Sequence, residues 1–290
     1  MQRQVISAGS QVRGGARQAR IIAVALTHAV LIIGACLFVG PFIWMVLTSL
    51  KTLGEATLVP PVIFPHIPQW HNYPDVLATL PFATFYLNTI LMALGRTLGQ
   101  LIICSLAAYA FARISFPGRT FWFLLTLSML MVPSYVFLLP QYLLMSSFGW
   151  LNSLQALIVP GLFSAFGTFL LRQFFLGLPP ELDEAAKIDG ANHIQIYWYI
   201  LLPLAKPALI ALTIFTMLAS WNDLIWPLVV NSSPDMLTLS VGLASLQGEH
   251  NTDFPMLMAG AVLASWPMLV LFMVLQRYFI EGIAITGTRG

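Results

Sequence analysis

The chain has 290 residues, of which 58% are hydrophobic and only 8% are charged, and its formal net charge is +2 at neutral pH. That charged share is about a third of the usual share in soluble domains, and the mean hydropathy is +0.83. The composition excludes an ordinary soluble protein, because such a surface needs lipid as its solvent.

Six stretches are long and apolar enough for a helix to cross a bilayer of about 30 Å. They lie at residues 23–48, 86–111, 121–145, 154–175, 206–230 and 256–279. Prolines fall in or beside most of them, and within a membrane neighbouring helices can satisfy the carbonyl groups that a proline frees. We therefore expect an all-α polytopic membrane protein, with residues 1–20 as an N-terminal tail and residues 21–290 as a single six-helix domain. In the second span, Gly95-x-x-x-Gly99 predicts close helix packing.

The first span follows an Arg-rich tail, and its sequence Ile33-Gly34-Ala35-Cys36 resembles a lipoprotein cleavage box. Its apolar run is about thirty residues long, whereas the core of a signal peptide has 7–15 residues. We therefore expect this segment to remain as a membrane span. Cys36 and Cys104 both fall in predicted spans, which favours free thiols over a disulfide.

Basic residues assign the orientation of the spans, because cytoplasmic loops are enriched in Lys and Arg. If the N-terminus is cytoplasmic, eleven of the thirteen basic residues fall in cytoplasmic segments: Arg3, Arg13, Arg17, Arg20, Arg113, Arg119, Arg172, Lys187, Lys206, Arg277 and Arg289. Both termini and the loop 177–205 are then cytoplasmic. The long outer loops are 49–85, whose prolines indicate an ordered lid at the membrane surface, and 231–255.

The loop 177–205 carries five charges within the nine positions from Glu181 to Asp189. Pro179 and Pro180 end the preceding span and suit the first turn of a new helix, where the helix dipole favours acidic residues. Gly190 suits the left-handed position that ends a helix. A second, amphipathic helix is predicted to follow, with one face formed by Ile194, Tyr197, Trp198 and Leu201. These signals predict that the loop forms two short helices joined by a turn, here called the elbow, which docks on a cytosolic protein. The alternative, a helix lying on lipid headgroups, favours a basic polar face.

The elbow also resembles a known motif. Glu184-Ala185-Ala186-x-x-Asp189-Gly190-Ala191, followed by Ile200-x-Leu202-Pro203, is similar to the EAA loop of ABC importer membrane subunits. The segments Ala107–Arg113, Trp221–Asp223 and Gln276–Gly282 resemble the carbohydrate (maltose-type) permeases of that family. The likeness covers nearly the whole chain and is to the shorter, six-span subunit of the permease pair.

The resemblance implies that the elbow is a coupling helix seated in a groove of a cytosolic ATPase. Glu184 and Asp189 would contact the ATPase, Gly190 would form the turn, and Ala185, Ala186 and Ala191 would allow close approach. The implied partners are a homologous permease subunit, two ATP-binding subunits that hold ATP and Mg, and an extracytoplasmic solute-binding protein. A heterodimer is favoured, with a homodimer as the alternative, in the inner (plasma) membrane. Closure of the ATPase pair would switch the spans between inward- and outward-facing states.

The chain carries no signature of its own for ATP hydrolysis. A P-loop needs Gly-Lys, and the three lysines follow Leu50, Ala186 and Ala205. The five histidines have no metal-ligand spacing. We expect no catalytic residue and no metal site here, and ATP hydrolysis by partner subunits.

Polar and ionisable groups inside spans are candidates for a transport pathway. Arg96 is the strongest, and the alternatives are a structural pair with a carboxylate such as Asp223 or a side chain that extends to the membrane interface. Trp221, Asn222 and Asp223 combine a ring with hydrogen-bonding groups that suit a sugar, and the alternative is an interfacial aromatic belt. The full set of candidates is Asn88, Arg96, Tyr135, Trp221, Asn222 and Asp223.

The predicted function is inward transport of a carbohydrate or polyol-type solute by alternating access. An ion-coupled secondary transporter would need acidic relays in the membrane or inverted repeats, and Asp223 is the one carboxylate near a span interior. A non-transporting scaffold for a cytosolic protein would explain the elbow, but neither Arg96 nor the outer loops.

Overall fold

The computed structural model describes the backbone of residues 2–248 and 252–287, and the side chains of residue 20 and of residues 22–248 and 252–276. Within this part of the chain every regular element is a helix, which confirms the all-α prediction. The chain divides into two compact units, Met1–Pro74 with Asp253–Val262 and Asp75–Thr252 with Leu263–Gly290, and each is described by itself.

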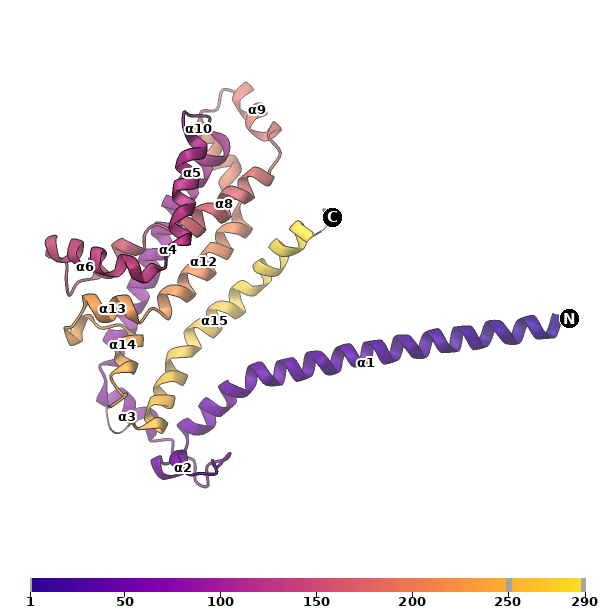
Figure 1. The fold of residues 1–290 in the computed structure, drawn as a ribbon, viewed down its shortest axis with the longest axis horizontal. Coiled ribbons are helices and arrows are strands. Elements are labelled where there is room, and N and C mark those ends of the chain that lie inside the picture. Colours follow the sequence, from indigo (N-terminus) through magenta and orange to yellow (C-terminus); the bar gives the residue numbers. More distant parts are fainter. Residues whose placement is uncertain (1, 249–251, 288–290) are drawn as a thin grey trace. The chain divides into compact units, whose positions relative to one another are not determined.

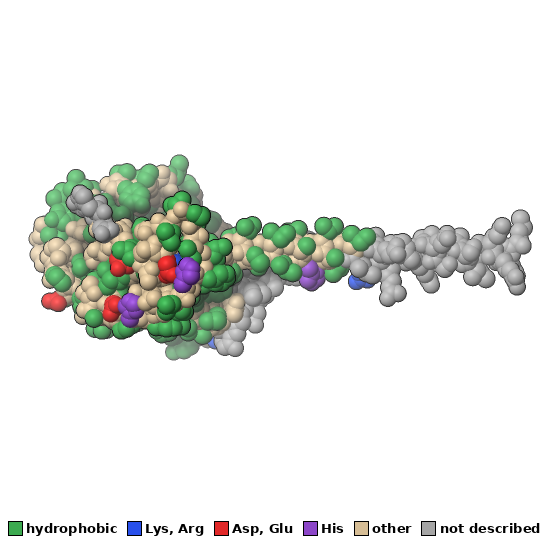
Figure 2. Space-filling view, turned by 90° about the horizontal axis from the view of Figure 1, so that it is seen from below, with side chains coloured by type: hydrophobic (Ala, Val, Ile, Leu, Met, Phe, Trp, Pro, Cys, Tyr) green, Lys and Arg blue, Asp and Glu red, His purple; other side chains and the backbone are tan. Residues whose placement is uncertain are grey.

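The first unit is dominated by α1 (Gln2–Ser49), which is followed by α2 (Leu53–Thr57). The described part of α1 exposes hydrophobic side chains along its length, among them Val30, Leu37 and Phe38 at 66%, 72% and 82% exposure. Figure 2 shows hydrophobic side chains over much of the face it presents, with few charged ones among them. The exposed hydrophobic surface of α1 suits a helix that is surrounded by lipid or by other membrane spans. Cys36, on α1, is a free thiol, as is Cys104 in the second unit.

The loop after α1 is ordered by its own hydrogen bonds. The Asn72 amide donates to the carbonyl oxygens of Ser49 (2.8 Å) and Lys51 (3.0 Å), so it satisfies groups that the helix end leaves free. Glu55 forms a capping box with Thr52 and accepts the backbone N–H of His66 at 3.1 Å. The N–H donors of Thr52 and His66, with the His66 ring, hold the pKa of the Glu55 carboxyl down at about 2.

The second unit contains most of the remaining helices, and α3 (Asn72–Thr79) and α15 (Phe254–Gly287) are shared between the two units. In chain order the others are α4 (Phe82–Arg113), α5 (Arg119–Ser128), η1 (Met129–Met131), η2 (Ser134–Phe137), α6 (Leu138–Ser147), α7 (Leu154–Ile158), η3 (Val159–Gly161), α8 (Ala165–Gly177), α9 (Glu181–Ile188), α10 (His193–Gln195), η4 (Ile196–Leu201), α11 (Leu202–Leu204), α12 (Lys206–Trp221), α13 (Ile225–Val230), η5 (Pro234–Met236) and α14 (Leu239–Ala244).

Helices α4, α8 and α12 form the centre of the second unit and run side by side (Figure 1). Their shared core continues into the elbow, since Ala186 of α9 and Tyr197 and Leu201 of η4 belong to the same buried cluster as Cys104 and Phe175. The elbow is therefore packed onto the helices rather than suspended from them.

The predicted close packing at Gly95 and Gly99 is confirmed. A Cβ at Gly95 would lie 2.9 Å from Ile158 Cδ1, and one at Gly99 would overlap the Leu162 side chain. The missing side chains allow α4 to approach the bend between η3 and α8, as small residues do between membrane helices.

The described helices overlap the predicted spans but are less regular. Among the described residues, three helices are long and apolar enough to cross a membrane: Ile22–Ser49, Phe82–Arg113 and Phe254–Gln276. Three bent pairs have the composition of one span each: Arg119–Met131 with Ser134–Ser147 (100°), Leu154–Gly161 with Ala165–Gly177 (42°), and His193–Leu204 with Lys206–Trp221 (76°). Six spans result if each pair crosses as a unit.

A continuous fifth span over residues 206–230 is contradicted. α12 ends at Trp221 and α13 begins at Ile225. Asp223 accepts the backbone N–H of Trp226 at 3.3 Å, a local bond by which aspartate competes with helix continuation. The orientation of the spans stays a prediction, and the side chains of Arg3, Arg13, Arg17, Arg277 and Arg289 lie outside the described residues.

We predict that Gly99→Ala destabilises the second unit by about 1–3 kcal/mol, the usual cost of overpacking. The added methyl would collide with Leu162. Gly177→Ala is the matched control, since a Cβ there meets nothing within 4 Å and the change should be neutral or slightly stabilising. Thermal unfolding of the purified protein measures both, and equal midpoints would contradict the packing.

Candidate functional site

The elbow (residues 177–205) begins with α9, which lies beyond the end of α8 (Figure 1). The predicted start is confirmed, because Pro180 precedes the helix and its first turn carries Glu181, Asp183 and Glu184. Gly190 has a φ of +82°, as predicted for the helix end. The Gly190 N–H donates to the Lys187 carbonyl (3.0 Å) and the Ala191 N–H to the Ala186 carbonyl (2.9 Å), which is the Schellman pattern.

The second half of the elbow is not a regular amphipathic α-helix, and that prediction is wrong. Asn192 and Gln195 form a capping box around α10, which has three residues, and the chain then winds as the π-helical η4. Leu201 is fully buried while Ile194 and Trp198 are 76% and 58% exposed, so these three side chains do not share one face. π segments of this kind often mark functional positions.

The side chains of the EAA motif divide between two surroundings. Glu184, Ala185, Asp189 and Gly190 are exposed, Ala191 is half-buried, and Ala186 is buried in the core of this chain. Ile188, between the charged residues, is 86% exposed. The exposed surface of α9 therefore combines an apolar side chain with carboxylates, a mixture that suits contact with another protein.

Arg113, the last residue of α4, fastens the elbow to the spans. Its Nη2 donates to the carbonyl oxygens of Phe175 (2.6 Å) and Leu178 (2.8 Å), at the end of α8. Its Nη1 lies 3.1 Å from Asp183 Oδ2 in the first turn of α9. The two side chains are only 11% and 12% exposed, so the pair is shielded from water. No spacing rule connects these two residues, and sequence reasoning missed the pair.

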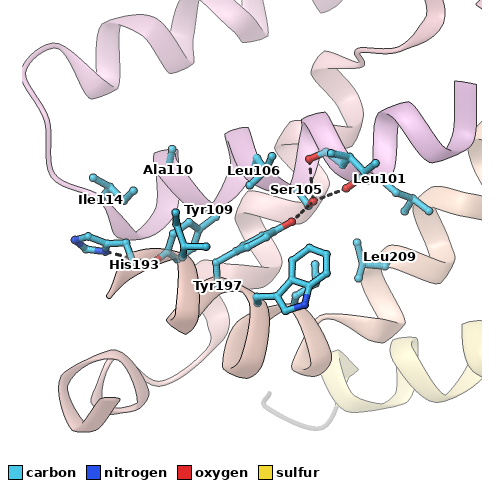
Figure 3. Close-up of a pocket in the computed structure, with 13 residues that line it drawn as sticks. Leu101, Ser105, Leu106, Tyr109, Ala110, Ile114, His193, Tyr197 and Leu209 are labelled. Atoms are coloured by element: carbon cyan, nitrogen blue, oxygen red, sulfur yellow. Dashed lines mark hydrogen bonds between the residues drawn. The ribbon is translucent and has the colours of Figure 1, made fainter. Parts of the chain in front are cut away.

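A cavity of about 560 Å³ lies between α4 and the second half of the elbow. Figure 3 shows Tyr197 pointing toward Ser105 and His193 lying beside Tyr109. The hydroxyl groups of Ser105 and Tyr197 are 2.7 Å apart, and the Tyr109 hydroxyl is 3.3 Å from His193 Nδ1. These two hydrogen bonds connect η4 and α10 to α4 across an otherwise apolar space.

Arg96 and Asp223 form a second charged centre, deeper in the helices. Arg96 Nη1 lies 2.8 Å from Asp223 Oδ2, so the paired role considered for Arg96 is confirmed. Arg96 Nε donates to the Leu157 carbonyl at 2.7 Å. Gly161 leaves the room for this side chain, because a Cβ there would lie 2.6 Å from Arg96 Cδ. The pair joins α4 to the break between α12 and α13.

The other pathway candidates lie in different surroundings. Tyr135 lines a cavity of about 250 Å³ together with Asp223. The Asn88 amide donates to the carbonyl oxygens of Asp235 and Leu237, which holds the start of α4 against η5. Trp221 is buried and donates to the Ala264 carbonyl. Asn222 is exposed and donates to the Leu218 carbonyl of its own helix.

In the part of the chain that the structure describes, no three His, Cys, Asp or Glu side chains are grouped as metal ligands. The contacts at the Arg113–Asp183 and Arg96–Asp223 pairs are ion pairs and hydrogen bonds to backbone carbonyl groups.

Comparisons with known proteins place this arrangement in a family. A family model described as "Binding-protein-dependent transport system inner membrane component" matches residues 100–285. The chain is 40% identical over 207 residues to the arabinooligosaccharides transport system permease protein AraQ of Halalkalibacterium halodurans, covering 71% of this chain and 74% of that protein. It is 34% identical over 258 residues to AraQ of Bacillus subtilis, covering 88% and 92%.

A further relative is the sn-glycerol-3-phosphate transport system permease protein UgpE of Yersinia pestis, 34% identical over 265 residues and covering 88% of this chain and 94% of that protein. Among solved structures, the fold is similar to a bacterial ABC transporter involved in the import of the acidic polysaccharide alginate. The TM-score is 0.78 at 25% identity, covering 91% of this chain and 98% of that chain. The chain belongs to the family of binding-protein-dependent transport system inner membrane components.

Proposed function

We propose that this chain is a permease subunit of an ATP-driven ABC importer for a carbohydrate or polyol-type solute. The observation that carries the proposal is an exposed EAA elbow fastened by a shielded ion pair to the membrane helices. An ion-coupled transporter or a passive scaffold has no need of that connection.

The exposed face of α9 is the contact with a cytosolic ATPase. Glu184 and Asp189 supply the polar contacts, since exposed carboxylates can accept charge-assisted hydrogen bonds from arginine or lysine. Ile188, 86% exposed, supplies the apolar contact. Ala185 has a small side chain and Gly190 has none, so the two proteins can approach closely there. Gly190 also forms the turn.

The buried side of the elbow transmits the motion. Ala186, Tyr197 and Leu201 share one core with α4, α8 and α12, and Arg113 ties α9 to the ends of α4 and α8. When two ATPase subunits close around ATP and Mg, the elbows of two permease subunits move and the helices follow as a body.

The partners are a homologous permease subunit, two cytosolic ATP-binding subunits and an extracytoplasmic solute-binding protein. Pairing with a homologous subunit as a heterodimer is favoured by the resemblance to the shorter permease of a pair. Both termini and the elbow lie in the cytoplasm. The carbohydrate class is supported by the two arabinooligosaccharide permeases among the relatives.

Glu184→Ala is expected to lower both ATP hydrolysis stimulated by the loaded binding protein and solute uptake by about tenfold or more. A hydrogen bond to a charged group is worth about 1.5–3 kcal/mol, and 1.4 kcal/mol corresponds to a factor of ten. The measurement is paired ATPase and uptake assays on the reconstituted complex. Glu181→Gln, an exposed acid in the same helix but outside the motif, is the matched control. Unchanged activity in Glu184→Ala would refute the contact.

Arg113→Gln is expected to act differently, by uncoupling. The elbow can still dock on the ATPase, but its connection to α4 and α8 is lost, so ATP hydrolysis persists while uptake per ATP falls several-fold. Asp183→Asn should give a milder form of this phenotype, because Arg113 keeps its bonds to the α8 carbonyl oxygens. The double variant should be no worse than Arg113→Gln alone, because both changes remove the same ion pair. Arg119→Gln, at the start of α5, is the control. A normal ratio of uptake to hydrolysis in Arg113→Gln would contradict this role.

A further inference from the structure

The bend between α5 and α6 opens a small polar cavity in the second unit. Its volume is about 250 Å³, and it is lined by Ser134, Tyr135, Leu138, Gln141, Asp223, Ile225 and Trp226. Two interruptions of helix meet here, the 100° bend before Ser134 and the break between α12 and α13. Irregular backbone and polar side chains are tolerated at membrane depth only inside protein or along a water-filled space. The location therefore suits a solute passage.

The charged pair beside the cavity is asymmetric. The Arg96 side chain is 10% exposed, lies outside the cavity lining, and donates to the Leu157 carbonyl as well as to Asp223. The Asp223 side chain is 22% exposed and lines the cavity. A solute in the cavity therefore meets the carboxylate, while the guanidinium neutralises that carboxylate from behind.

The lining also carries a hydroxyl at Ser134, a phenol at Tyr135 and an amide at Gln141, whereas the Trp226 indole N–H donates to the Ala156 carbonyl. No lining residue is basic. The hydroxyl, the phenol and the amide exchange hydrogen bonds with hydroxyl groups. An anionic solute would find no Lys or Arg in the lining to pair with its charge, and Arg96, beside the cavity, is already paired with Asp223. The charge of such a solute would stay uncompensated away from bulk water, which is unfavourable.

We propose that this cavity contacts the cargo directly, that it takes one ring of a neutral, hydroxyl-rich solute, and that it disfavours acidic ones. The contacts are Ser134, Tyr135, Gln141 and Asp223. The volume is just below the usual range of about 300–1,000 Å³ for ligand pockets, so a longer sugar passes ring by ring. The inference rests on the proposed carbohydrate import. The inference also narrows the proposed solute class to neutral sugars. This distinction matters because the relatives include permeases named for arabinooligosaccharides, which are neutral, and for sn-glycerol-3-phosphate, which is acidic.

The test is direct binding to the permease–ATPase complex in nanodiscs without any binding protein, by saturation-transfer difference NMR. The neutral probes are arabinotriose, xylotriose and maltotriose, and the acidic probes are trigalacturonate and sn-glycerol-3-phosphate. At least one neutral trisaccharide should receive saturation, at a level tenfold or more above both acidic probes.

Variants assign the signal to the cavity. Tyr135→Phe combined with Gln141→Leu should reduce the neutral signal at least fivefold, while Tyr142→Phe, a nearby half-buried tyrosine outside the lining, should leave it unchanged. Asp223→Asn removes the charge that neutralises Arg96 beside the cavity and should raise the acidic signal. Thermal unfolding checks that each variant is folded. If Asp223→Asn does not fold, the variant with Tyr135→Phe and Gln141→Leu still tests the proposal.

Equal or stronger saturation of the acidic probes would overturn the proposal, as would a neutral signal that ignores Tyr135 and Gln141. Absence of transfer to every probe would also overturn it, since the cavity would then contact no cargo. ATP-dependent uptake by the complete importer tests the proposed function separately, so the two failures are distinguishable.

Discussion

One guanidinium determines how the elbow relates to the membrane helices. Arg113, at the end of α4, donates to two carbonyl oxygens at the end of α8 and pairs with the Asp183 carboxylate of α9, so it joins three elements. Removing one partner of a buried ion pair strongly destabilises the folded protein, because the charge of the other partner is left buried and uncompensated. The orientation of the exposed EAA surface therefore depends on this pair and on the core beneath Ala186.

The same constraint governs the second charged centre. In lipid an ionisable side chain must be paired or face water, and Arg96 is paired with Asp223 while its Nε satisfies the Leu157 carbonyl. The pair sits where α12 breaks, because Asp223 also accepts from the α13 backbone. One carboxylate thus ends a helix, balances a buried cation and gives a small cavity its electrostatic character. Glycines at 95, 99 and 161 provide the space in which these elements meet.

Local residue patterns predicted the helix start and turn that neighbouring residues determine. They missed the contacts between residues far apart in the sequence. The start of α9 and its turn at Gly190 follow from proline, acidic residues and glycine within a few positions, and both are confirmed. The π winding of η4 carries no periodic signature. Ile194 and Trp198 are exposed while Leu201 is buried, although the sequence predicts one face for all three. The partnership of Arg113 and Asp183 joins distant parts of the chain, and composition cannot reveal it. The sequence offers the pairing of Arg96 with Asp223 as an alternative to a pathway role, because ionisable groups inside spans are few, and the structure contains that pair.

The central claim is that the elbow and the α4 helix move as one body. It is tested by electron–electron double resonance between spin labels at Glu181 and Leu98, both exposed, in a Cys36→Ser background. Glu181 lies on α9 and Leu98 on α4, within the same unit. The account predicts the same distance in the nucleotide-free and ATP-trapped importer, and a broadened or shifted one when Arg113 is replaced by Gln. A change of about 5 Å or more in the otherwise unaltered importer, one helical turn of sliding, would contradict it.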